Sequence, residues 1–79
     1  MTSRLLNYSS RQAWDDEIAQ NTEMFFEADR LDARAYEIIE RYSGDAATWA
    51  RFTEAKKVAD AQRTAAYREW MRINRAKRK

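Results

Sequence analysis

Three features of the sequence predict an all-α fold, an antiparallel hairpin of two long helices preceded by a short N-terminal lead-in. The 79 residues contain no proline and only one glycine, so little in the chain interrupts a helix. Apolar residues recur at three- and four-residue spacings on both sides of that glycine, as in helices that bury one face. Alanine, glutamate, arginine and lysine, all strong helix formers, fill the two segments. No stretch has the character of a strand, a repeat or a flexible linker.

The ends of the helices are predicted from capping signals. Ser9 and Gln12 have the spacing of a capping box, which predicts a helix start just before Trp14. Gly44 can adopt the left-handed conformation that ends a helix, and Asp45 is a good N-cap for the next one. The predicted elements are a lead-in at 1–10 and a hairpin domain at 11–79, made of a helix at 11–43, a turn at 44–45 and a helix at 46–76.

The apolar positions predict how the two helices pair. In the first helix, residues at 4-3-4-3-4 spacing form the seam of a coiled coil: Met24, Ala28, Leu31, Ala35, Ile38 and Tyr42. Further apolar residues, Trp14 and Phe25 among them, widen this seam to an arc of about 160°. Folding at Gly44 pairs residues whose numbers add up to about 88, which places Asp32 opposite Lys56. The large aromatics expected in the core are Trp14, Trp49, Phe52 and Trp70.

A two-helix hairpin leaves part of this arc uncovered. One partner helix spans only a fraction of about 160°, and a bare hairpin of this size has a predicted stability near zero. The cover can come from the N-terminal segment, from a second copy that completes a four-helix bundle, or from a different protein. We expect a second copy, because C2 homodimers are the commonest oligomers. The residues predicted to lie at a protein interface are Tyr8, Phe26, Leu31, Ile38 and Met71.

Four polar residues point toward the seam rather than away from it: Asn21, Asp32, Lys56 and Arg63. Charged groups in a cleft can have shifted pKa values and serve catalysis. Polar residues at the edge of a core also fix helix alignment and oligomeric state. We expect the second role.

Charge is divided unevenly along the chain. The formal net charge is only +2, but residues 1–45 carry a net −5 and residues 46–79 a net +7. A basic stripe at 4-3-4 spacing closes the second helix: Arg68, Arg72, Arg75 and Lys79, with Lys77 and Arg78 beside it. Such a stripe can lie along a nucleic-acid backbone. It can equally be a solvated face whose cations complement the helix dipole. No recognised nucleic-acid-binding motif accompanies it.

The residue types exclude most catalytic and metal chemistry. The chain has no cysteine and no histidine, which rules out disulfides, a thiol nucleophile, a Ser-His pair and imidazole ligands. Carboxylates cluster at Asp15, Asp16 and Glu17, which we interpret as acids placed in a first helical turn. Glu37 and Glu40 have the spacing of carboxylate metal sites in bundles, but those sites also use histidine. We predict no catalytic residue, no metal and no cofactor.

The predicted function is that of a small, non-enzymatic accessory protein: an adaptor, inhibitor or modulator that binds a protein partner. The alternative is a nucleic-acid-associated protein that uses the basic stripe. No run approaches the roughly 18 apolar residues of a membrane span, and no signal-peptide pattern is present. We therefore expect a cytoplasmic protein that does not enter a membrane.

Overall fold

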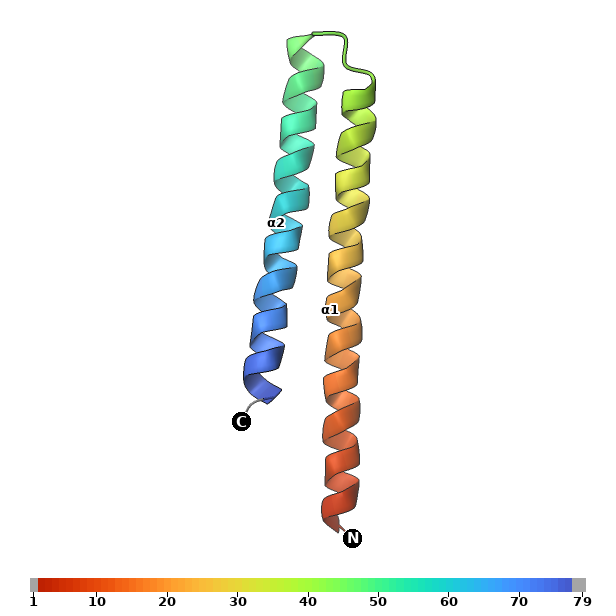
Figure 1. Cartoon of the computed structure of the whole chain (residues 1–79), viewed down its shortest axis with the longest axis vertical. Helices are drawn as coiled ribbons and strands as arrows, with labels where there is room; N and C mark the ends of the chain where they lie inside the picture. Colours follow the sequence, from red (N-terminus) through yellow and green to blue (C-terminus); the bar gives the residue numbers. More distant parts are fainter. Residues whose placement is uncertain (1, 78–79) are drawn as a thin grey trace.

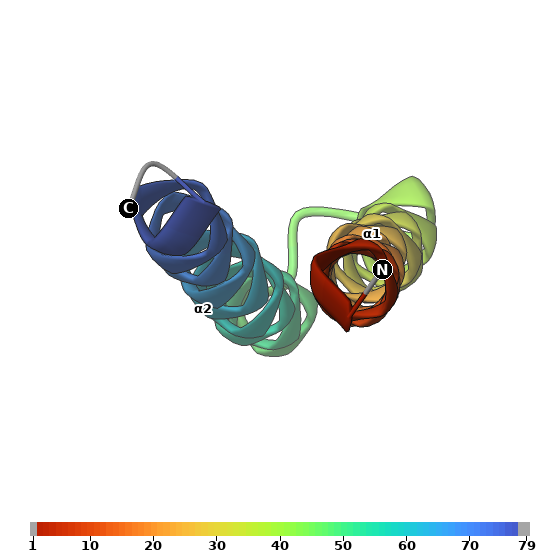
Figure 2. The ribbon, with the colours of Figure 1, turned by 90° about the horizontal axis from the view of Figure 1, so that it is seen from below.

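The computed structural model describes the backbone of residues 2–77 and the side chains of residues 12–76. Two helices, α1 (Thr2–Glu40) and α2 (Ala46–Lys77), run antiparallel and pack side by side as a rod of 67 × 17 × 10 Å (Figure 1). The predicted all-α hairpin is confirmed. Viewed from its lower end, the described chain forms one layer, in which no third element covers either side of the helix pair (Figure 2). Within the described residues, neither helix contains a segment long and apolar enough to cross a membrane.

The first helix begins at Thr2 instead of residue 11, so residues 2–10 continue α1 rather than form a separate lead-in. The reason is that nothing in residues 1–10 breaks a helix, since the segment contains neither proline nor glycine. The capping-box spacing of Ser9 and Gln12 therefore does not mark the helix start. The first turn of α1 contains no acidic residue. The helix-dipole explanation of Asp15, Asp16 and Glu17 is accordingly wrong.

The turn between the helices spans residues 41–45. The helix ends at Glu40 instead of residue 43, because the amides of Arg41 and Tyr42 bond to carbonyls three residues back, those of Ile38 and Ile39, at 3.3 and 3.0 Å. Gly44 has φ +88°, a left-handed conformation that favours glycine.

Asp45 then caps α2, as predicted. Its Oδ2 accepts hydrogen bonds from the Thr48 amide at 2.9 Å and from the Thr48 hydroxyl at 2.6 Å. These two bonds hold the pKa of the Asp45 carboxyl at about 2, below its ordinary 3.8. The cap fixes the first residue of α2 and thereby sets the pairing of the two helices.

The helices touch through residues spaced seven apart, which we call the contact stripe: Asn21, Ala28 and Ala35 on α1, and Ala59, Ala66 and Ile73 on α2. Asn21 is 2% exposed and the other five are fully buried. A seven-residue interval is close to two helical turns, so each set forms a straight column facing the other helix. Four of the six side chains are methyl groups. The helices therefore approach closely while burying little apolar surface.

Two of the aromatics expected in the core lie outside it. Trp49 is 50% exposed and Trp70 is 42% exposed, whereas Trp14 and Phe52 are half-buried. The prediction of Trp49 and Trp70 as core residues is wrong for the single hairpin. The alanines of the contact stripe bring the helices too close for an indole to fit between them. The large rings are displaced to the side.

Candidate interaction surface

Two further columns of side chains run along one side of the hairpin. They hold Ile18, Phe25, Asp32 and Ile39 on α1, and Trp49, Lys56, Arg63 and Trp70 on α2, again at seven-residue intervals. Contacts of Asp32 with both Lys56 and Arg63 place the two columns on the same side. We call this side the aromatic flank, and include with it the rings that contact its members or lie next to them: Tyr36, Tyr42, Phe52 and Tyr67. Both columns are mainly apolar toward their ends and charged in the middle.

Four rings meet at the end of the flank near the turn. Trp49 stands between Tyr42 and Phe52, with ring centroids 5.9 and 5.6 Å away. Phe52 continues the series to Tyr36 at 5.9 Å. All three pairs are tilted, a favourable arrangement for aromatic quadrupoles. Tyr36, Tyr42 and Trp49 nevertheless remain about half exposed, at 52%, 45% and 50%.

A smaller ring cluster lies toward the other end. Phe25 and Tyr67 meet edge to face, with centroids 5.0 Å apart and an interplanar angle of 83°. Tyr67 is 55% exposed, more than any other large apolar or aromatic side chain in the described part of the chain. Trp70, three residues further along α2, extends the cluster by almost one turn.

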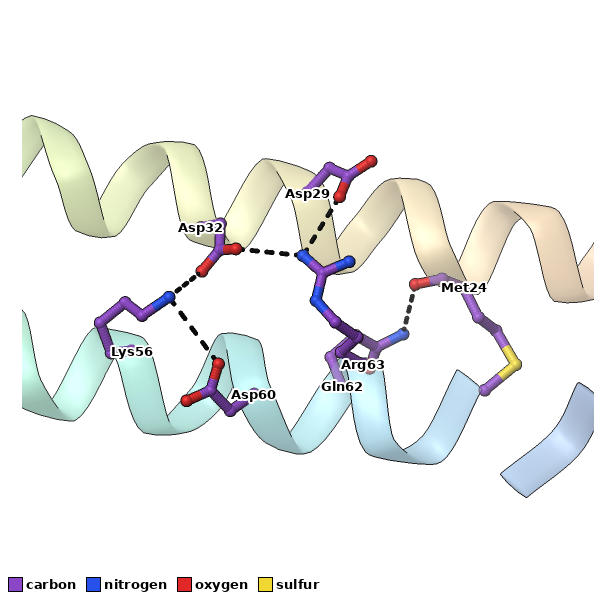
Figure 3. A network of polar contacts seen from close by, with 7 residues as sticks. All are labelled: Met24, Asp29, Asp32, Lys56, Asp60, Gln62 and Arg63. Carbon is purple, nitrogen blue, oxygen red and sulfur yellow. Dashed lines mark hydrogen bonds and ion pairs between the residues drawn. The ribbon is translucent and has the colours of Figure 1, made fainter. Parts of the chain in front are cut away.

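Charged residues of both helices form a network in the middle of the flank, and Figure 3 shows their contacts across the helix pair. Asp32 accepts from Lys56 Nζ at 2.6 Å and from Arg63 Nη2 at 3.0 Å. Arg63 Nη2 also reaches Asp29 at 3.1 Å, and Lys56 lies 3.7 Å from Asp60. The side chains of Asp32, Lys56 and Arg63 are about one-quarter to one-third exposed. The predicted pairing of Asp32 with Lys56 is thus confirmed.

The network shifts the pKa values of its members in the directions expected for ion pairs. The hydrogen bond from Lys56 is the main cause that lowers the pKa of Asp32, and the same bond raises the pKa of Lys56. Asp29 and then Asp32 raise the pKa of Arg63. Lys56 Nζ also lies 5.3 Å from the centre of the Tyr36 ring, which joins the network to the ring cluster near the turn. All three charges are therefore stabilised in place.

Two amides tie the helices together by bonding to backbone. Asn21 Nδ2 donates to the Ala66 carbonyl at 2.9 Å, and Gln62 Nε2 donates to the Met24 carbonyl at 3.2 Å. The orientation of Asn21 toward the seam is confirmed by this bond and by its burial. Because each bond is satisfied at only one helix alignment, both amides favour a single register.

The basic stripe is partly neutralised within the hairpin. Arg72 Nη2 lies 3.1 Å from Glu17 of α1 and also pairs with Glu69. These carboxylates raise the pKa of Arg72, and Arg72 in turn lowers the pKa of Glu69. Arg68 and Arg75 are exposed and make no ion pair among the described residues. The side chains of Lys77, Arg78 and Lys79 lie outside the described residues.

The structure describes four of the five side chains predicted at a protein interface. Phe26 is 49% exposed and Leu31 is half-buried. Ile38 lines a hollow of about 340 Å³ near the turn, beside three arginines, whereas Met71 lines one of about 450 Å³ near the end of α2. The side chain of Tyr8 lies outside the described residues. Their role at an interface stays a prediction.

The sequence pattern did not predict the aromatic flank. The angular position of a residue around its helix gives the direction of the side chain but not its burial. A signal for the flank is present in the sequence. One column at seven-residue spacing holds Trp49, Lys56, Arg63 and Trp70, which groups the two tryptophans with two charges rather than with the core.

Among the described residues, no group of three or more carboxylates lies close enough to hold a metal ion.

Comparison of the chain with protein-family models, with curated proteins and with solved structures finds no match.

Proposed function

We propose that this chain is a non-catalytic interaction protein that binds a protein partner through the aromatic flank. The observation that carries the proposal is the exposure of five rings on this side of the hairpin, each between 42% and 55%: Tyr36, Tyr42, Trp49, Tyr67 and Trp70. Tryptophan and tyrosine are the residue types most enriched where binding energy concentrates. Four of the five, Tyr36, Tyr42, Trp49 and Tyr67, contact another ring. Rings held in this way lose little side-chain freedom on binding, which favours affinity.

The size of the uncovered surface suits a protein partner. A tryptophan or tyrosine side chain has about 150–250 Å² of surface, so five half-exposed rings leave roughly 500 Å² uncovered. A standard interface covers about 800 Å² on each partner. The rings would thus supply most of one interface, with the network around Asp32 and Lys56 as its polar part.

The charged network itself does not favour catalysis. Asp32 already accepts from two cations, and its pKa is lowered, away from the range in which a carboxyl exchanges protons near neutral pH. Lys56 is stabilised as a cation and is a poor nucleophile in that state. Both groups are better suited to fixing alignment and orientation.

Binding to nucleic acid is the second candidate, favoured by Arg68 and Arg75, which are exposed and make no ion pair within the described part of the chain. This candidate is less favoured because Arg72, in the middle of the basic stripe, already pairs with Glu17 and Glu69. The two proposals differ in their salt dependence, since contacts with phosphates weaken steeply as salt rises.

The experiment compares two double variants for capture of a partner by the tagged chain. Trp49→Ala with Trp70→Ala should abolish capture, whereas Phe26→Ala with Met71→Ala, two equally exposed residues away from the ring clusters, should leave it intact. Circular dichroism verifies that both variants keep their helices. Capture that survives the tryptophan substitutions contradicts the proposal. The second candidate is supported if the chain instead binds duplex DNA at low salt and this binding is lost with Arg68→Ala and Arg75→Ala.

A further inference from the structure

We infer that the partner on the aromatic flank is a second copy of this chain, and that two hairpins stack flank to flank as a four-helix bundle with both turns at the same end. The inference rests on the proposed function, since it names the partner for the same surface. Three observations support it: the area exposed by one hairpin, the charges of its two helices and the repeat of the flank along the rod.

The exposed area of one hairpin exceeds that of a compact protein of the same mass. The chain has 6524 Å² of accessible surface for 9.4 kDa, whereas a compact monomer of this mass exposes about 5,000 Å². A standard dimer covers about 800 Å² on each partner, so one interface would remove roughly half of the excess. The contact stripe contributes little apolar burial of its own, because Ile73 is the one large side chain fully buried in the described part of the chain.

The charges of the two helices select the orientation of the second copy. Residues 2–40 contain nine acidic and four basic residues, a net −5, and residues 46–77 contain three acidic and eight basic residues, a net +5. A twofold axis parallel to the rod places α1 of each copy on α2 of the other, and so brings acidic helices against basic ones. A twofold axis across the rod, in the plane between the flanks, would stack α1 on α1 and α2 on α2, which is electrostatically unfavourable.

The pattern along the flank agrees with the same axis. Rotation about the long axis keeps every residue at its own height, so each ring cluster meets its own copy. At the middle, Asp32 of one copy comes to the level of Lys56 and Arg63 of the other. The charged layer would then be paired across the interface as well as within each hairpin. All adjacent helices run antiparallel in this arrangement.

Light scattering of the chain tests whether the dimer exists. The expected mass is about 19 kDa, twice that of the chain, and stable as salt rises because the contact is mainly apolar. Trp49→Ala with Trp70→Ala should return the mass to 9.4 kDa, whereas Phe26→Ala with Met71→Ala should not. A monomer at high protein concentration, or a dimer that survives the tryptophan substitutions, overturns the inference.

The absence of cysteine allows the orientation to be tested with single introduced thiols. Both Ser43, in the turn, and Ala76, near the end of α2, are exposed. With turns at the same end, Ser43→Cys should cross-link to another Ser43→Cys chain through a short bismaleimide, and a mixture with Ala76→Cys should give no mixed product. With turns at opposite ends, the mixed product would form, because about 45 Å of helix separates the two ends. That outcome overturns the arrangement.

A charge-reversed pair gives an independent check that the charged layer lies within the dimer interface. Asp32→Lys and Lys56→Asp each place like charges at the middle of a homodimer, whereas a mixture restores opposite charges across the interface. Mixing should raise the dimer fraction several-fold over either variant alone, and no gain on mixing overturns the placement of this layer in the interface. Should the chain prove monomeric while partner capture still depends on Trp49 and Trp70, the proposed function stands and only this inference fails.

Discussion

The contact stripe and the aromatic flank lie side by side on the same two helices, yet they distribute large and small side chains in opposite ways. The stripe buries Ala28 and Ala59 completely, and the flank leaves Trp49 and Trp70 about half exposed. In a compact domain large apolar side chains are mostly buried together with the small ones. The stripe thus sets the distance between the helices, while the flank holds most of the apolar surface that could still be covered.

The largest expected effect comes from the one large side chain in the stripe. Ile73→Ala removes a fully buried side chain and should lower the free energy of unfolding by about 2–5 kcal/mol, because the cavity cannot collapse completely. Met71→Ala, at a half-exposed position two residues away, is the matched control. Thermal unfolding followed by circular dichroism measures both. Equal losses of stability in the two variants would contradict the distinction between the buried stripe and the exposed surface.

Enlarging an alanine of the stripe should have the next largest effect. Ala28→Leu adds three carbons at a fully buried position and should lower the free energy of unfolding by about 1–3 kcal/mol. Tm should fall by roughly 4–8 °C for each kcal/mol. Ala33→Leu, on an exposed part of the same helix, should change Tm little. If Ala28→Leu proved neutral, the helices would not be held as close as the stripe implies.

The cap at Asp45 belongs to neither region and provides a pH-dependent reference. Its folded pKa of about 2 lies below the ordinary 3.8, so the cap stabilises the hairpin above about pH 4 and loses this contribution as the pH falls toward 2. Asp45→Asn keeps a capping oxygen that does not titrate. As the pH falls through this window, the Tm of the original chain should therefore fall by a few degrees relative to that of the variant. A constant difference would contradict the cap.

The smallest effect is expected within the flank. Asp32→Asn removes the carboxylate shared by Lys56 and Arg63, and should lower Tm more than Asp29→Asn, which removes a single contact of a more exposed side chain. Because the folded pKa of Asp32 is lowered, its contribution is present above the ordinary carboxyl pKa and is lost in acid. Raising the salt concentration should shrink both losses. A larger loss for Asp29→Asn would reverse the ranking of these two carboxylates.

The sequence was sufficient for the hairpin and for its register. A single glycine, the cap at Asp45 and the two apolar faces leave only one way to fold, and the pair Asp32 and Lys56 lies where that fold requires. The boundaries of α1 were harder to predict from the sequence. A capping-box spacing at Ser9 competes with an uninterrupted helical segment before it, and helix propensity prevails there.

The exposure of the rings was not predictable from the positions of residues around a helix. That representation gives the direction of a side chain but not the distance between the helix axes, which here depends on methyl groups meeting at Ala28, Ala35, Ala59 and Ala66. Trp49 and Trp70 lie in a seven-residue column next to the stripe, and they are about half exposed instead of filling the space between the helices.

The seven-residue spacing of the stripe also makes the length of the rod divisible. The flank shares this spacing, so each layer has the same height, about 10 Å, and the same orientation as the next. Deleting residues 22–28 together with residues 59–65 would remove one complete layer. It would leave Asn21 opposite Ala66 and Ala35 opposite Phe52, now as adjacent layers. A chain shorter by fourteen residues could therefore retain the turn and both ends unchanged, and the hairpin has a natural unit in which it can be shortened or extended.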